Sequence, residues 1–548
     1  MRWLKAISLG PLLLAGHGLA AQDVFDRTSP VQQVERERPL AEVEAAIRIE
    51  VQPVLDQPLS PADTATLAVG SVVIDGLEVL SRRDFAAAIE PFAGRNLDRT
   101  ELRQLTDAVA EAARQRGYIL ATAWIPEQAL VGGMLRVRVD EGAIDDVRVE
   151  GSDDPAIRTQ LQRLIGRGPI TLDALQREVL LADDLPGVWI RGTRFENDGQ
   201  RRVLVVDARR QDFSGSALVT TDGTRPVGPV RARIDLNANG LISPRDRVDL
   251  SYTMSPIDPD ELRFVNARYS VVVNDHGTVL GLFGSYSQTQ PGAYLADRQI
   301  EGEAWQGGIR LRHPLMRSQQ RSLWLEASAE LQDLRQDRAG VLSRQDRIAL
   351  ARVGFYGYAP LAGGTLQGRA TVSHGFDVLD ATRLGDPLAS RTDASSEFTT
   401  LLWWLGWQRG LAKRVSLSLA ASGQFASDPL LIGESFALGG NAFLRGYDFS
   451  QRVGDQGIAG VGELRYDWPD AMGLVPNVQL YAFADGGTVS NLADGLGGGS
   501  LASSGGGFRA DITRNLDLDF EIAVPLTEDR YDTDDKTPRL NLRVVQSF

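Results

Sequence analysis

The sequence predicts a transmembrane β-barrel of about sixteen antiparallel strands, preceded by two small α+β domains. Strands that alternate between apolar and charged residues recur from residue 211 to residue 548, as expected where one barrel face contacts lipid and the other lines a wet interior. A β-α-α-β-β pattern occurs twice before them, within residues 68–142 and 143–210. A soluble β-sandwich also has alternating strands, but an export signal and the terminal strand favour the membrane barrel.

Residues 1–21 have the pattern of a secretory signal peptide. Arg2 and Lys5 give a basic start, residues 7–15 are mostly apolar, and Ala20 and Ala21 offer a small-residue cleavage site. The apolar run is too short for a membrane-spanning helix and is interrupted by glycine and proline. No later run of about twenty apolar residues occurs, so we expect membrane insertion to use strands.

The composition excludes several kinds of partner and site. The chain has no cysteine, so it has neither disulfides nor thiolate metal ligands. Its formal net charge of −14 becomes −16 without the two basic residues of the signal, which excludes nucleic acid as the expected partner. Nucleic-acid binders present basic surfaces instead.

No motif indicates an active site or a cofactor. His276, His313 and His374 lack the spacing of metal ligands. Residues 433–437 lack the final glycine of a nucleophile elbow, and the acidic residues within 532–535 lack the glycine and distal glutamate of a calcium loop. The sequence therefore predicts a protein that is not an enzyme and has no metal or other cofactor.

Residues 22–67 are polar and rich in proline, which indicates a linker that carries one short helix. Ser29 is a suitable N-cap, Pro30 suits the first helical position, and Gln32 completes a capping box. We expect this helix to end at Arg38, before Pro39, and residues 39–67 to form the linker.

The first α+β domain is predicted within residues 68–142. We expect a strand over 69–74, a helix that begins near Ser81, a second helix with Asp98 and Glu101 as its capping box, and strands over 118–125 and 134–139. Gly117 is the expected C-cap of the second helix.

The same order repeats within residues 143–210. Strands are expected over 145–150, 188–194 and 203–207, and helices over 155–165 and 172–181. Two tandem units with exposed sheet edges favour a binding array over a catalytic domain.

The barrel prediction for residues 211–548 depends on strand alternation and on the end of the chain. In the last strand, Leu540, Leu542, Val544 and Phe548 point one way and charged or polar residues point the other. Trp403, Trp404 and Trp407 fit an aromatic girdle at the membrane interface.

The candidate site is a glycine-rich loop that carries one arginine. Gly439-Gly440 precedes the segment Leu444-Arg445-Gly446-Tyr447, and glycines permit tight turns and a close approach to a wall. If Leu464 and Leu480 face lipid, strand alternation turns Glu463, Phe483 and Asp485 toward the lumen. An arginine fork can bind such inward carboxylates.

Several of these segments resemble a known family. Residues 117–144 (GYILATAWIPEQALVGGMLRVRVDEGAI) and 175–188 (LQREVLLADDLPGV) resemble the two POTRA (polypeptide-transport-associated) domains of two-partner secretion transporters, the TpsB or haemolysin secretion/activation family. LRGY at 444–447 and FADGG at 483–487 resemble the loop and strand motifs of POTRA-bearing barrels, with Leu444 where valine is usual. Asp222-Gly223-Thr224 resembles their first-strand motif without its usual asparagine.

The resemblance implies both geometry and function. It implies sixteen strands, an Arg445 that contacts Asp485 with Glu463 as a second acceptor, and conserved spacing of Phe483, Asp485 and Gly487. It also implies an outer-membrane transporter, with POTRA domains in the periplasm, that secretes a large TpsA-like exoprotein. The chain itself would be inserted into outer-membrane lipid by the barrel assembly machinery.

Two further implications concern the resting state and the competing functions. By resemblance, the helix at 22–38 is a plug that occupies the lumen together with the Arg445 loop and leaves when the channel opens. The main alternative is an insertase of the BamA or TamA kind, but those usually have three or more POTRA domains. A passive porin needs none.

Overall fold

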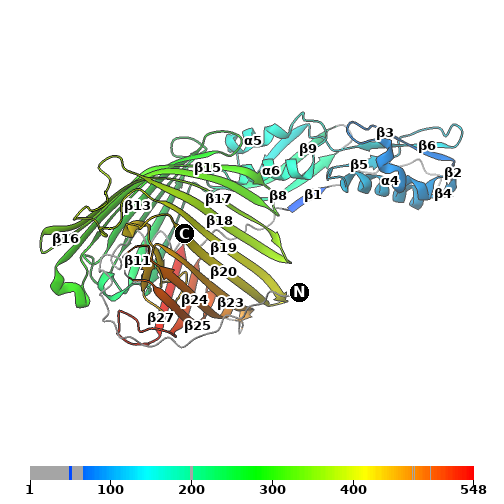
Figure 1. Cartoon of the computed structure of the whole chain (residues 1–548). Helices are drawn as coiled ribbons and strands as arrows, with labels where there is room; N and C mark the ends of the chain where they lie inside the picture. Colours follow the sequence, from blue (N-terminus) through cyan, green and yellow to red (C-terminus); the bar gives the residue numbers. More distant parts are fainter. Residues whose placement is uncertain are drawn as a thin grey trace, which may run out of the picture.

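The computed structural model of the chain describes residues 48–51, 66–197, 201–471, 473, 475–493, 495 and 497–548. Figure 1 shows a barrel with two α+β domains in a row at one of its rims, the domain with α5 and α6 next to the barrel and the domain with α4 farther away. The predicted signal peptide, the helix expected at 22–38 and most of the expected linker lie outside the described residues. No helix in the described part of the chain is long and apolar enough to cross a membrane.

The first domain has the predicted order of elements with shorter pieces. Its elements are β2 (Leu67–Val69), β3 (Ser71–Asp75), η1 (Arg82–Phe85), α3 (Ala86–Ile89), η2 (Glu90–Phe92), β4 (Arg95–Leu97), α4 (Arg99–Arg114), β5 (Thr122–Trp124) and β6 (Met134–Asp140). Asp98 and Glu101 form the predicted capping box of α4. The first helix is short because Pro91 has no N–H with which to continue it.

The second domain repeats this order in a four-stranded sheet, β1-β8-β9-β7. Its elements are β7 (Asp146–Glu150), α5 (Pro155–Leu161), η3 (Gln162–Leu164), α6 (Leu172–Asp183), β8 (Val188–Asn197) and β9 (Arg202–Arg210). The edge strand β1 (Arg48–Val51) pairs in parallel with β8. The expectation of a continuous linker over 39–67 missed this strand, because four residues without flanking turn signals are too short to recognise.

Direct contacts join the two domains. Leu172 N donates to Gly117 O (2.8 Å), and Leu120 packs in the hydrophobic core of the second domain. Arg202 of β9 binds Asp140 (3.0 Å) and Asp145 (2.8 Å) at the junction. Hydrogen bonds from Arg202 hold the pKa of Asp145 below its usual value.

The second domain is joined in turn to the turns at one rim of the barrel. Arg317, at the end of β15, binds the carboxylate of Asp184 with two nitrogens (2.7 and 2.9 Å). Gln160 of α5 donates to Asp275 O (3.0 Å) in the turn after β13. The α+β array therefore has a defined position at the mouth of the barrel.

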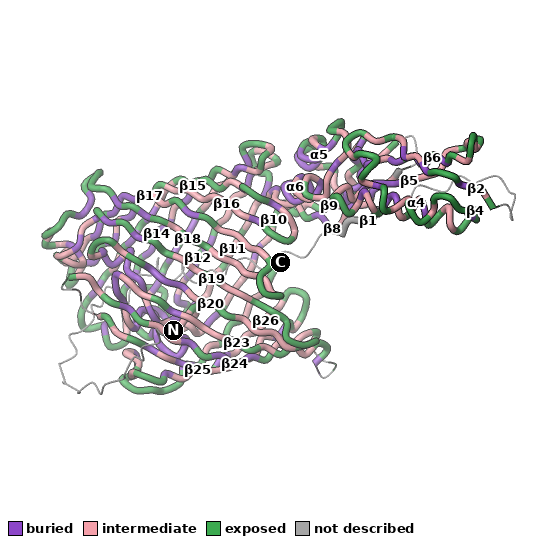
Figure 2. The backbone as a smooth tube through the Cα atoms, turned by 45° about the vertical axis from the view of Figure 1, so that its right-hand side comes forward, coloured by how far each residue is buried: buried purple, intermediate pink, exposed green. Residues whose placement is uncertain are grey.

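The barrel closes with sixteen antiparallel strands, as predicted. In chain order they are β10 (Phe213–Thr220), β11 (Arg231–Asn239), β12 (Asp246–Met254), β13 (Arg263–Val272), β14 (Val279–Thr289), β15 (Ile300–Arg317), β16 (Ser322–Arg338), β17 (Val341–Leu361), β18 (Gly364–Phe376), β19 (Thr399–Ala412), β20 (Val415–Ala426), β23 (Gln456–Ala471), β24 (Val475–Ser490), β25 (Gly499–Asp511), β26 (Leu516–Pro525) and β27 (Arg539–Ser547). Figure 2 shows exposed and less exposed residues alternating along these strands.

One prediction about the barrel wall is wrong. Trp404 pairs with Arg369, which binds the lumen-lining Glu326, so Trp404 faces the inside. Trp403 and Trp407 have the opposite orientation, because successive residues of a strand point to opposite faces. Three tryptophans within five residues therefore cannot all belong to one outer girdle.

The seam between the first and last strands depends on Gly215. Gly215 and Phe548 exchange two backbone hydrogen bonds of 3.0 Å, and a Cβ at Gly215 would lie 2.6 Å from the Phe548 ring. We expect Gly215→Ala to destabilise the closed barrel by about 1–3 kcal/mol through overpacking.

The change is measurable as a lower temperature at which the folded, fast-migrating band disappears in gel electrophoresis. Gly284→Ala is the matched control, since the nearest atom to its Cβ would be 3.7 Å away. Equal melting of the two variants would contradict the role of this seam.

An arginine loop inside the barrel

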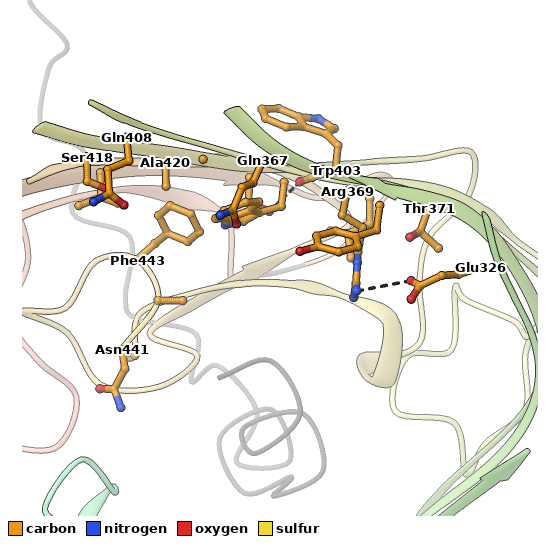
Figure 3. A pocket seen from close by; sticks show the side chains of 18 of the residues that line it. Glu326, Gln367, Arg369, Thr371, Trp403, Gln408, Ser418, Ala420, Asn441 and Phe443 are labelled. Atoms are coloured by element: carbon orange, nitrogen blue, oxygen red, sulfur yellow. Dashed lines mark hydrogen bonds and ion pairs between the residues drawn. The ribbon is translucent and has the colours of Figure 1, made fainter. Parts of the chain in front are cut away.

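The segment between β20 and β23, residues 427–455, folds back from the outer rim into the lumen. It contains η6 (Ile432–Glu434) and a short hairpin of β21 (Phe436–Leu438) and β22 (Arg452–Gly454). Phe443 and Arg445 line the same cavity as the inner faces of the wall strands. Figure 3 shows Phe443 pointing toward Ser418 and Ala420 on the wall, whereas Asn441 points away from them.

Backbone geometry explains the glycines around Arg445. Gly439 and Gly440 have φ values of 102° and 108°, where other residues are strained. Gly446 lies so close to β25 and β26 that a Cβ would be 2.8 Å from Ser503 Cβ and from Pro525 N. The loop therefore lies directly on the wall at the residue after the arginine.

Arg445 contacts three carboxylates, two by hydrogen bonds from its guanidinium and one by a hydrogen bond from its backbone N–H. Its Nη1 donates to Glu521 Oε2 (2.7 Å) and its Nη2 to Glu463 Oε2 (3.0 Å). The backbone N–H of Arg445 donates to Asp485 Oδ2 (3.0 Å), and the guanidinium lies 3.4 Å from the centre of the Phe483 ring. The residue is only 8% exposed, so these contacts replace water almost completely.

The carboxylates have further partners that balance their charge. Glu463 also accepts from Arg465 Nε (2.7 Å) and Arg509 Nη1 (2.9 Å). Asp485 accepts a hydrogen bond from the Ser503 hydroxyl, and Glu521 accepts one from Tyr481 (2.9 Å). Three arginines thus face three carboxylates in one connected network, which is the condition for burying charge without a large penalty.

The other residues of the two motifs lie around this network. Leu444 is fully buried with Tyr447, whose hydroxyl accepts from Thr527 N (2.9 Å) and Glu528 N (3.1 Å). A Cβ at Gly487 would lie 3.0 Å from Leu438, so Gly487 makes room for the hairpin. The structure thus brings together the residues singled out in the sequence: Leu444, Arg445, Gly446, Tyr447, Glu463, Phe483, Asp485 and Gly487.

The sequence analysis missed Glu521 as a partner of Arg445. It lies on β26, 76 residues beyond the arginine, and belongs to no motif. Alternation does place it on the polar face of that strand, together with Asp517 and Asp519. That pattern gives its orientation but not which loop it meets.

The first-strand motif also contacts the loop. Asn441 donates a hydrogen bond to the Asp222 carboxylate, and Arg539 of β27 donates to Asp222 O (2.8 Å) and to Tyr447 O (2.7 Å). The part of the loop around Asn441 and Tyr447 is therefore attached at the seam between the first and last strands of the barrel.

The lumen is a polar cavity of about 2220 Å³. Among the described residues, eleven arginines and four acidic side chains line it. The three histidines beyond the signal have separate partners: Arg163 faces His276, Thr278 faces His313, and Thr399 faces His374. In the described part of the chain, no group of three His, Cys, Asp or Glu could hold a metal ion.

A closed sixteen-stranded barrel with α+β domains at one mouth and an arginine loop in its lumen defines the class of POTRA-bearing outer-membrane barrels. The family model described as haemolysin secretion/activation protein ShlB/FhaC/HecB matches residues 199–510, more than half of the 548 residues, and the chain belongs to this family. The model described as POTRA domain, ShlB-type, matches residues 67–142. The chain is an outer-membrane transporter with its POTRA domains in the periplasm.

Individual proteins agree with this assignment. The heme/hemopexin transporter protein HuxB of Haemophilus influenzae (strain 86-028NP) is 23% identical over 396 residues, which cover 68% of this chain and 67% of HuxB. The outer membrane transporter CdiB of Escherichia coli is 36% identical over 88 residues, or 16% of this chain and 15% of that protein.

Solved structures agree in fold. CdiB from Escherichia coli superposes with a TM-score of 0.69 at 21% identity and covers 97% of this chain and 100% of its own. BamA from Haemophilus ducreyi lacking POTRA domains 1–3 has a TM-score of 0.54 at 13% identity and covers 88% of this chain and 100% of its own.

The fit of Gly446 against the wall gives a test of the loop position. We expect Gly446→Ala to lift the loop, because its Cβ would meet backbone atoms that cannot move aside. Trypsin added to intact cells should then cleave after Arg445, which is 8% exposed and protected in the parent. Gly460→Ala is the control, since its Cβ would have 3.5 Å to the nearest atom. Protection of Arg445 in both variants would show that the loop tolerates the added methyl group.

Proposed function

We propose that this transporter secretes one large, unfolded TpsA-like exoprotein from the periplasm through the lumen of its barrel. The observation that carries the proposal is a lumen lined by many charged residues that contains a loop held in place by buried ion pairs. Such a barrier is stable at rest, yet it can be displaced as one unit. Motion through the pore needs neither nucleotide nor cofactor, because folding of the client outside the cell biases net movement outward. The chain has no enzymatic role in this scheme.

The α+β array supplies the entrance. An extended segment of the chain, β1, already pairs with β8 and forms one edge of the sheet, which supports the idea that this sheet accepts added strands. Strand addition uses backbone hydrogen bonds, so it suits an unfolded client with loose sequence requirements. The contacts of Arg317 and Gln160 place this domain at the mouth of the lumen.

Other partners follow from the membrane location. The outward faces of the strands carry exposed apolar residues such as Leu464 (50%) and Leu480 (42%), which suit contact with outer-membrane lipid. The last strand ends with an aromatic residue, Phe548, which is a feature that suits recognition by the barrel assembly machinery. The negative net charge opposes binding to nucleic acid.

An insertase that assembles other barrels is the second candidate. The likeness to BamA favours it in fold alone. Two α+β units, against the three or more usual in insertases, count against it. Removal of this chain from cells should therefore leave the assembly of other outer-membrane proteins unchanged while its client accumulates in the periplasm.

Arginine 445 is the residue whose loss tests the secretion function. Removal of one partner from a buried charge network costs about 3–5 kcal/mol, because the carboxylates stay buried without compensation. Arg445→Ala should leave the barrel in the membrane and lower secretion of the client by at least about tenfold. Both quantities can be measured by immunoblotting of the membrane and the culture medium.

A lumen arginine outside the loop network provides the control. Arg233 lines the cavity and binds Asp235 (2.6 Å) on its own strand. Arg233→Ala should secrete like the parent. Normal secretion by Arg445→Ala would rule out a role for the loop network in transport.

The plug role expected for the helix at residues 22–38 can be tested by measuring channel conductance. A purified chain without residues 22–38 should form a steadily open channel in a planar bilayer, whereas the full mature chain should be mostly closed. This truncation retains β1, so the second domain keeps its edge partner. Failure of both forms to conduct would favour the insertase function.

A further inference from the structure

A second buried ion pair holds the other arm of the same loop. Glu434, in η6, lies eleven residues before Arg445 and is 6% exposed. Arg352 of β17 grips both of its oxygens, with Nη2 to Oε1 at 2.7 Å and Nη1 to Oε2 at 3.0 Å. A two-pronged contact of this kind fixes direction as well as distance.

Three neighbouring wall strands build the receptor for Glu434. Arg352 also donates to Glu330 on β16 (3.3 Å) and to Ser373 on β18 (2.7 Å), and Gln332 donates to Glu434 (3.4 Å). The adjoining residues of the loop are apolar and buried: Leu430 and Leu431 pack with Ile348 and Leu350, and Ile432 packs with Leu334. The loop is therefore seated on this wall by packing and by charge.

The two ion networks lie on different walls. In the closed order of sixteen strands, β17 is the eighth, whereas Glu463, Asp485 and Glu521 lie on the twelfth, thirteenth and fifteenth strands. The loop starts between them, at β20, the eleventh strand. The charges are also reversed, because Glu434 of the loop meets a wall arginine whereas Arg445 of the loop meets wall carboxylates.

We propose that Glu434 and Arg352 form a second anchor of the loop, separate from the Arg445 network. In the resting state the loop is then attached to the wall of the lumen at two points. The proposal extends the gating role given to the loop above and rests on it for its consequence in secretion. The two anchors share no residue, so each can be released alone. Release of the Glu434 arm opens the side of β16–β18, and release of the Arg445 arm opens the side of β23–β26.

Thiol labelling can distinguish the two anchors, because the chain has no cysteine and an added one is unique. Ser435 is next to Glu434 and 4% exposed, so Ser435→Cys should react slowly with a maleimide in the otherwise unchanged full chain. We expect Glu434→Gln to raise the labelling rate at this position at least about tenfold, since a neutral amide does not hold the arginine fork. Arg445→Ala should raise it far less, because that change frees the opposite arm.

Matched variants test whether the charge pair itself is responsible. The lumen pair Glu326 and Arg369 (3.4 Å) does not touch the loop, so Glu326→Gln should leave labelling at the parent rate. Glu434→Gln is nearly isosteric and leaves Arg352 paired with Glu330, so the folded barrel should form, as heat-modifiable migration would show.

The outcomes separate this proposal from the proposed function. Slow labelling in a folded Glu434→Gln barrel, or an equal rise in Glu326→Gln, would overturn the second anchor. A rise in labelling in Glu434→Gln that Glu326→Gln does not show would support it. If labelling and the open fraction of single channels rise while secretion of the client stays normal, the anchor stands and the gating role of the loop fails.

Discussion

The structure depends on the burial of one arginine inside a barrel. Arg445 lies on a loop that enters the barrel from the outer rim, and it contacts Glu463, Asp485 and Glu521 of the barrel wall. Because these charges are almost completely buried, the network stabilises the position of the loop only while each charge has its partners. The glycines of the loop, the aromatic ring of Phe483 and the extra arginines at Glu463 all serve to keep that network complete.

On another wall of the barrel, Glu434 and Arg352 form a similar pair with the charges exchanged. The loop is therefore held to the wall by ion pairs at two places, Glu434 and Arg445. The second α+β domain, which Arg317 and Asp184 hold against the periplasmic turns, lies at the opposite end of the barrel. In the proposed function, a client that approaches from the periplasm meets the sheet edge of the second domain first. It then meets the arginine-rich cavity and, near the outer rim, the loop that carries Glu434 and Arg445.

Much of this could be predicted from sequence, because a strand has a period of two. Alternation alone placed Glu463, Phe483 and Asp485 on the inner face, and the motif around Arg445 indicated what they meet. The number of strands, about sixteen, followed from the length of the strand-rich segment and from the family resemblance, and the repeated α+β order followed from the periodicities of helices and strands. Alternation should also have excluded Trp404 from the outer girdle, since its neighbour Trp403 takes the other face.

The rest depended on contacts between distant segments. Glu521 and Glu434 look like ordinary polar residues of a strand and a turn, and only the closed barrel brings them to Arg445 and Arg352. In the sequence, Glu434 belongs to the incomplete nucleophile motif at residues 433–437, whereas in the structure it forms an ion pair with Arg352. The strand β1 was missed because its pairing with β8 comes from tertiary structure rather than from its own four residues.

The most direct test of the account is to trap a client inside the lumen during secretion. Gln367 lines the cavity, whereas its neighbour Leu366 pairs with Trp407 on the outer face. Q367C and L366C each introduce the only cysteine of the chain, and a client with one cysteine can form a disulfide with either under mild oxidation. The account predicts adducts with Q367C and none with L366C while secretion proceeds. Adducts with neither or with both, while the client still reaches the medium, would contradict passage through this barrel.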